Sequence, residues 1–257
     1  MSHSKINHWY FSPRTELVGV FITAWAMALC FMLVNEPNWN ALFLLLSTLG
    51  YYSLDHLLDL RKINSVALKS YTIWYFVLIV LSISVYLGLT IYLGFSQSIY
   101  GFLMRFWPTV LIGLLYLSLR FLKQGLFSAA LKLLMIAFAA GFAIVFPAEA
   151  KHLLIAPLVC LSNLLVFSYL ERKKDFALGN NGLFQVSSTE TWLTYFLIVL
   201  AGTAVLMKII FDVKYGFGAG IYSILALFMM QNESKFRQNT YRWWLDALLP
   251  VAFLPFG

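Results

Sequence analysis

Residues 40–62 read NALFLLLSTLGYYSLDHLLDLRK, an apolar run that ends in two carboxylates and two cations. The run predicts a helix long enough to cross a bilayer, and the spacing of four places Asp55 and Asp59 on one helix face. Acids near the C-terminal end of a helix need a positive charge close by, because the macrodipole is negative there. Arg61 and Lys62 could supply that charge, and so could a bound divalent cation that holds an anionic substrate.

The composition of the whole chain is that of a polytopic membrane protein. Of its 257 residues, 61% are hydrophobic and 11% are charged, with a mean hydropathy of +0.80, which excludes a soluble domain. The hydropathy predicts an all-α fold with nine transmembrane helices. They are expected near residues 17–34, 40–60, 71–94, 102–121, 129–147, 152–170, 191–211, 215–231 and 241–256. Residues 1–15 are expected to form a short interfacial arm.

The positive charges predict the orientation of these helices. If the N-terminus is cytoplasmic, nine crossings place fourteen of the 18 Lys and Arg residues on the cytoplasmic side. This bias follows the positive-inside rule and predicts an external C-terminus, in what we expect to be a bacterial inner membrane. Membrane orientation therefore explains the net charge of +7, and no nucleic-acid partner is expected. Attraction to anionic lipid or phosphate is a secondary expectation.

The predicted helix 152–170 and the residues just after it carry a second series with a spacing of four. Asn163, Phe167, Glu171 and Asp175 lie on one face, and the helix is expected to break across 171–175, before a Gly-Asn-Asn-Gly turn. An unpaired amide in hydrocarbon costs several kcal/mol, so Asn163 should meet a protein partner or an internal cavity.

Other polar and small residues of the apolar segments have simpler interpretations. Asp246 is expected to pair with Arg242 four residues before it, in preference to a ligand-binding role. Cys30 and Cys160 are isolated and are expected to be packing residues. Small side chains give the predicted helix 129–147 a flat face for close packing; they are Ala137, Ala139, Ala140, Gly141 and Ala143.

Two acidic pairs at the same end of two helices suit the chemistry of a diphosphate. Mg²⁺ takes oxygen ligands and is held by one or two carboxylates together with phosphate oxygens. Facing carboxylate pairs could clamp a magnesium-bound diphosphate, and nearby Lys and Arg could neutralise the leaving group. In the alternative, the four acids only pair with neighbouring cations, which are Arg61, Lys62, Arg172, Lys173 and Lys174.

The first acidic segment resembles that of the UbiA-type superfamily of intramembrane prenyltransferases. That family carries an NDxxDxxxD-like motif after its second helix. Asp55 and Asp59 match the last two acids of the motif, and Tyr51 and Tyr52 stand where the family has Asn and the first Asp.

The resemblance extends over the rest of the chain. Glu171 and Asp175 match the DxxxD-like pair after the family's sixth helix, and Gly179 follows four residues later. Lys132 and Pro147 match the lysine and the proline at the two ends of the family's fifth helix.

The resemblance implies a single UbiA-like domain over residues 1–257, bundled around a central cavity that opens near the cytoplasmic side. It implies transfer of a polyprenyl group from a polyprenyl diphosphate to an aromatic or other hydrophobic acceptor, with Mg²⁺ as cofactor. The expected metal ligands and catalytic residues are Asp55, Asp59, Glu171 and Asp175. The expected diphosphate or substrate contacts are Arg61, Lys62, Lys69, Lys123, Lys132, Lys174, Tyr51 and Asn163.

Two other classes of function remain open. Because Tyr51 and Tyr52 replace an Asn and an acid, the chain could be a catalytically degenerate relative that binds an isoprenoid or another lipid, or scaffolds a partner. A transporter is the third class, since intramembrane acids can mark ion routes. The sequence shows neither an inverted repeat nor paired helix breaks at mid-membrane depth, which transporters often have.

Overall fold

The structure is a computed structural model that describes residues 13–35, 38–60, 66–94, 100–119, 126–146, 150–177, 189–235 and 240–256. Within these ranges some side chains are not described; they belong to residues 13–15, 59–60, 66–71, 117, 119, 126–129, 150–151, 173–177, 189 and 242. Most of the interfacial arm predicted for residues 1–15 lies outside the described residues, and the first described helix already begins at Pro13.

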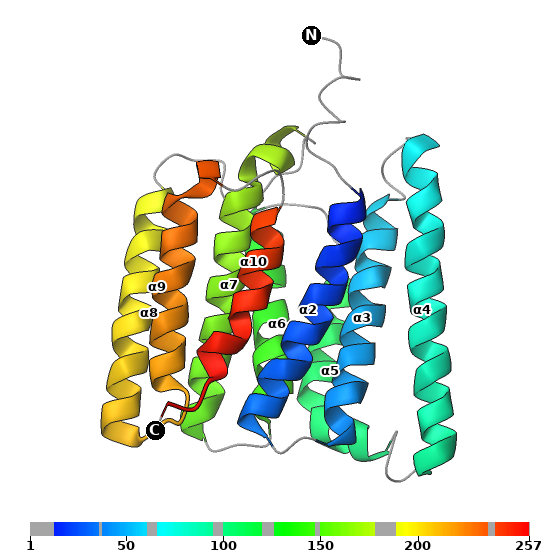
Figure 1. The fold of residues 1–257 in the computed structure, drawn as a ribbon, viewed down its shortest axis with the longest axis horizontal. Coiled ribbons are helices and arrows are strands. Elements are labelled where there is room, and N and C mark those ends of the chain that lie inside the picture. Colours follow the sequence, from blue (N-terminus) through cyan, green and yellow to red (C-terminus); the bar gives the residue numbers. More distant parts are fainter. Residues whose placement is uncertain are drawn as a thin grey trace.

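The described residues form nine α-helices and two short 3-10 helices, with no strand among them, which confirms the all-α fold class. The elements are α2 (Pro13–Val34), α3 (Trp39–Leu60), α4 (Val66–Leu93), α5 (Gly101–Leu119), α6 (Leu126–Val145), α7 (Ala150–Ala177), α8 (Thr189–Phe211), α9 (Gly216–Gln231), η2 (Glu233–Lys235), α10 (Thr240–Leu248) and η3 (Leu249–Phe253). Successive α-helices run in opposite directions, so Pro13 and the C-terminus lie at opposite ends of the bundle (Figure 1). We call these ends the N-end and the C-end.

Five of the described helices are long and apolar enough to cross a membrane, which supports the membrane character predicted from composition. Their spans are Glu16–Val34, Trp39–Leu58, Thr72–Leu93, His152–Arg172 and Glu190–Phe211. Shorter apolar helices lie beside them, at Gly101–Tyr116, Ala130–Val145, Gly216–Gln231 and Trp243–Phe253.

Exposed aromatic side chains gather near both ends of the bundle. Trp39, Tyr92 and Trp107 are about half exposed or more toward the C-end, and Trp74 and Trp192 are exposed toward the N-end. Trp and Tyr favour the level of the lipid headgroups, because they combine an apolar ring with a polar group. Exposed Trp and Tyr near both ends therefore fit a bundle that lies across a bilayer.

Two predicted helix boundaries were wrong. α7 does not break at Glu171 but continues to Ala177, because Glu, Arg and Lys are good helix formers once the apolar run has ended. The last predicted segment, 241–256, is α-helical only to Leu248 and continues as a 3-10 helix. Pro250 explains the change, because its nitrogen cannot donate the α-helical hydrogen bond.

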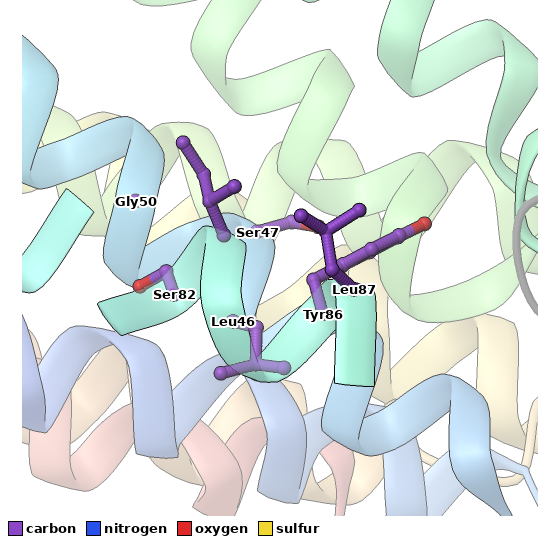
Figure 2. Close-up of a pocket in the computed structure, with 7 residues that line it drawn as sticks. Leu46, Ser47, Gly50, Ser82, Tyr86 and Leu87 are labelled. Carbon is purple, nitrogen blue, oxygen red and sulfur yellow. The ribbon is translucent and has the colours of Figure 1, made fainter. Parts of the chain in front are cut away.

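Small residues allow close helix contacts at two places. A Cβ atom added to Gly141 of α6 would lie only 2.4 Å from the backbone nitrogen of Pro157 in α7, which confirms the predicted close packing at Gly141. α3 and α4 meet at Gly50 and Ser82, where an added Cβ would lie 3.6 Å from the Ser82 Cβ. Figure 2 shows these two residues beside a hollow of about 230 Å³ on this side of the bundle.

Candidate functional site

A groove of about 300 Å³ lies between α3 and α5, and residues of α6 and α2 complete its wall. α3 packs against α2 and α4, whereas α5 packs against α6, so the groove lies between two packed groups of helices. It extends along α5 from Phe102 to Tyr116, which corresponds to about 21 Å at the α-helical rise per residue. Its lining is mostly aliphatic and aromatic, so it suits an extended apolar chain.

The end of the groove nearest the N-end is lined by tyrosines and adjoins a carboxylate. Tyr51 and Tyr52 come from α3 and Tyr116 from α5, and the rings of Tyr51 and Tyr116 lie 5.9 Å apart. The Tyr116 hydroxyl donates to Oδ1 of Asp55 at 3.3 Å. Asp55 is half-buried and lies one turn beyond Tyr51, as the spacing of four predicts. The hydroxyl from α5 was not foreseen, because Tyr116 is a single polar group within an apolar run.

Lys132 is placed at the same end of the groove by its position on α6. The residues of α6 that line the groove include Ile136, Ala140 and Ala143, and Lys132 lies one turn before Ile136 on the same face. Its side chain is partly buried. The predicted acid Asp55 and the predicted cation Lys132 therefore lie next to the same end of the groove, on two of the helices that line it.

Aromatic rings close the groove toward the C-end. Phe102 and Phe106 line it with ring centroids 4.5 Å apart, and Phe43 packs against Phe102 at 5.8 Å. α5 bends at Phe106, whose φ of −106° and ψ of 15° are not helical, two residues before Pro108. A proline inside a helix removes a backbone hydrogen bond and clashes with the preceding turn, which accounts for the bend.

The first two residues of the predicted series on α7, Asn163 and Phe167, lie on the face that contacts α10. The Asn163 amide donates to Oδ1 of Asp246 in α10 at 3.1 Å, and one turn later the Phe167 ring lies 6.5 Å from that of Tyr241. Glu171 continues the same series and is partly buried. The contacts of Asn163 and Phe167 with α10 confirm that these two residues share a face, as the spacing of four predicts.

A buried polar network connects four helices around Asp246. Thr23 of α2 donates to Oδ2 of Asp246 at 2.6 Å, and Tyr222 of α9 donates to Oδ1 of Asn163 at 2.6 Å. All four side chains are buried, which confirms that Asn163 meets protein partners. Its amide is engaged here and does not line the groove. The partner predicted for Asp246, Arg242, has a side chain outside the described set.

Arg172 of α7 pairs with an acid on another element. Its Nη2 lies 2.8 Å from Oε2 of Glu233 in η2, and its guanidinium lies 3.6 Å from the centroid of the Tyr169 ring. Tyr169 in turn donates to Glu190 of α8 at 2.8 Å. Arg172 therefore links α7 to η2 and lies beside the contact with α8.

Several predicted site residues, or their side chains, lie outside the part of the chain that the structure describes. The segments with Arg61, Lys62 and Lys123 are not described, nor are the side chains of Asp59, Lys69, Lys174 and Asp175. Convergence of the four acids on one metal-bound diphosphate therefore stays a prediction. Among the side chains that are described, no group of three or more His, Cys, Asp or Glu residues is arranged to hold a metal ion.

Comparison of the chain with protein-family models, with curated proteins and with solved structures finds no match.

Proposed function

We propose that this protein is an intramembrane prenyltransferase that moves a polyprenyl group from a polyprenyl diphosphate to an aromatic or other hydrophobic acceptor. The observation that carries the proposal is the apolar groove between α3 and α5, which ends beside Asp55 and Tyr116. Lys132, one turn before the groove-lining Ile136 of α6, adds a positive charge near that end. A long apolar tail with an anionic head is the ligand that such a groove suits.

The groove accepts the tail because its lining is mostly apolar, and a lipid-like tail passes from the bilayer into the groove without crossing water. Phe102 and Phe106 line the part of the groove nearest the C-end, where the tail would lie, and Tyr51 lines the opposite end. Aromatic faces attract cations, so Tyr51 would stabilise positive charge that develops on the allylic carbon as diphosphate departs.

The head of the ligand belongs at the N-end of the groove. Asp55 offers carboxylate oxygens, which are the ligands that Mg²⁺ prefers, and the neutral donor Tyr116 orients this carboxylate without cancelling its charge. Asp59, Glu171 and Asp175 would complete the magnesium sites. Bound Mg²⁺ would offset the negative charge of the leaving diphosphate. Lys132 would contact the diphosphate directly, with further cations from Arg61, Lys62, Lys69, Lys123 and Lys174.

Diphosphate release tests the role of Asp55. Purified protein in lipid nanodiscs is mixed with Mg²⁺, an aromatic acceptor and polyprenyl diphosphates of different lengths, and the released diphosphate is measured. We expect Asp55→Asn to slow release about 100-fold or more, since even residues that only support metal ligands contribute about 10- to 100-fold. Asp212→Asn is the matched control, because Asp212 is exposed in the α8–α9 loop at the C-end. Equal rates for the two variants would refute the site.

A second variant tests the groove itself. A Cβ added to Gly113 of α5 has no atom within 4 Å, although Gly113 lines the groove, so Gly113→Phe fills the groove with little strain on the backbone. We expect kcat/KM for a long-chain donor to fall about 10-fold, a loss near 1.4 kcal/mol. Gly88→Phe on α4 is the control, since Gly88 is equally unobstructed but lies away from the groove. Unchanged kcat/KM in Gly113→Phe would show that the tail binds elsewhere.

The same groove also fits a relative that binds an isoprenoid or lipid without catalysis, because its apolar lining does not depend on the acids. In that case Gly113→Phe would weaken binding of a radiolabelled polyprenol, whereas Asp55→Asn and a metal chelator would leave it unchanged. Diphosphate release with Mg²⁺ by the unaltered protein separates the two functions.

A further inference from the structure

A single arginine lies near the C-end of the bundle, at the opposite end from Asp55. Arg105 is in the second turn of α5, and its guanidinium lies 5.0 Å from the centroid of the Phe31 ring and 6.0 Å from that of Phe106. Its Nη2 donates to Oδ1 of Asn35 at 2.7 Å. The cation is therefore held by aromatic rings and by one neutral amide oxygen.

Asn35 is itself fixed in one orientation. Its amide nitrogen donates to the Ile144 carbonyl at 2.7 Å and to the Phe31 carbonyl at 3.0 Å, so its oxygen must face Arg105. The end of α2 and the end of α6 thus hold the guanidinium in place. A cation that is fixed before a ligand arrives loses little conformational entropy when it binds an anion.

The charge of Arg105 has no acidic partner among the described residues. None of the described residues accepts a hydrogen bond from its buried Nε–H group. The one described hydrogen bond of the guanidinium goes from Nη2 to Asn35. A buried donor without a partner and a desolvated cation without a counter-charge are both unfavourable. Lys208, another cation toward the C-end, is different because its Nζ lies 2.7 Å from Asp212.

The surroundings of Arg105 point to a lipid as the source of the missing anion. Tyr100 and Trp107, on either side of it in sequence, are more than half exposed, as is Met104 beside it. Exposed Tyr and Trp mark the level of the headgroups, and the exposed apolar side chains of α5 offer a surface to acyl chains. Arginine binds phosphate well because its planar fork presents parallel donors.

We propose that Arg105 and Asn35 form a binding site for the phosphate group of an anionic lipid in the leaflet at the C-end. The guanidinium donates through Nη1 and the second N–H of Nη2 to the phosphate oxygens, while the other N–H of Nη2 stays on Asn35. The lipid tails lie along the exposed face of α5. This site is separate from the diphosphate end of the groove and does not depend on catalysis.

The thermal stability of the protein in nanodiscs of defined composition tests this site. We expect the Tm to rise by about 3 °C when phosphatidylcholine is replaced by phosphatidylglycerol, the shift expected for about a tenfold gain in binding. Arg105→Gln should remove most of this rise. Lys208→Gln, which removes a cation that already has an acidic partner, should keep it.

Further control experiments test whether the anion that binds Arg105 is a lipid phosphate and whether an acidic residue already neutralises Arg105. Inorganic phosphate added to phosphatidylcholine nanodiscs should give no rise in Tm, and a rise of equal size would overturn the assignment to a lipid. An equal response of the unaltered protein and Arg105→Gln to phosphatidylglycerol would overturn the site. If Glu36→Gln lowers the Tm in phosphatidylcholine as much as Arg105→Gln does, Glu36 neutralises the arginine and the proposal is wrong.

Discussion

Gly141 is the position at which the packing of the bundle predicts the largest effect from the smallest change. A Cβ added there would lie 2.4, 2.6 and 2.7 Å from the N, Cα and Cγ atoms of Pro157. Two of these are backbone atoms of a rigid proline, so no rotamer change relieves the overlap. Ordinary contact begins near 3.4 Å, so α6 and α7 must separate locally by about 1 Å to accept Gly141→Ala.

The expected cost follows from two opposed terms. Overpacking a well-packed site costs about 1–3 kcal/mol, and the higher helix propensity of Ala returns up to about 1 kcal/mol. We therefore expect Gly141→Ala to destabilise the protein by about 1–2 kcal/mol, a fall in Tm of roughly 2–6 °C. Ala140 and Ala143 of α6 line the groove, so the shift should also slow diphosphate release.

Thermal unfolding in a single detergent is the assay, with Gly202→Ala in α8 as the control. A Cβ added to Gly202 has no atom within 4 Å, so this variant keeps the propensity gain without the overlap and should be as stable as the unaltered protein or slightly more so. If the two variants have the same Tm, the contact between Gly141 and Pro157 is looser than the reasoning requires.

Two further predictions concern tyrosines with buried hydroxyls. Tyr222→Phe removes the donor to Oδ1 of Asn163 and leaves a buried acceptor unpaired, so it should cost about 1–3 kcal/mol in the free energy of unfolding; a smaller loss than in a lipid-facing variant such as Ile224→Ala would contradict the network. Tyr215, in the loop between α8 and α9, donates to the His152 carbonyl at 2.8 Å, and burial raises the pKa of its hydroxyl. A raised folded-state pKa stabilises the fold below the unfolded value near 10, and this contribution is lost as the pH rises above it. The Tm of the unaltered protein should therefore fall more steeply than that of Tyr215→Phe above about pH 10, and parallel curves would show that Tyr215 contributes nothing.

The buried network around Asp246 holds the short last helix, α10, in the bundle. α10 is α-helical over nine residues, which is too few to cross a bilayer. Hydrogen bonds from Thr23 and Asn163 to Asp246 attach it to α2 and α7, and Leu245 beside Asp246 is fully buried. Specific polar contacts of this kind hold helices together where lipid tails compete equally for apolar surface.

Hydropathy determined the helices because its physical cause is local. A run of about twenty apolar residues must satisfy its backbone within itself when it enters hydrocarbon, so each run in the sequence forms a helix wherever it packs. The positions of Asp55 relative to Tyr51, and of Glu171 relative to Asn163, were likewise predictable, because the helical repeat fixes which residues share a face. The end of α7 was not, because charged residues that leave the apolar run still favour a helix.

Only the tertiary structure decided which faces meet. Hydropathy does not say that α5 lies across a groove from α3, and this arrangement brings Tyr116 to Asp55. The hydrogen-bond partners of Asp246 and Arg105 come from segments far away in the sequence, and each is a single Thr or Asn with no spacing that marks it. Helix pairing in a membrane depends on close packing at a few small residues, such as Gly141 against Pro157, and on isolated hydrogen bonds. Such contacts depend on three-dimensional proximity, which the period of a helix does not encode.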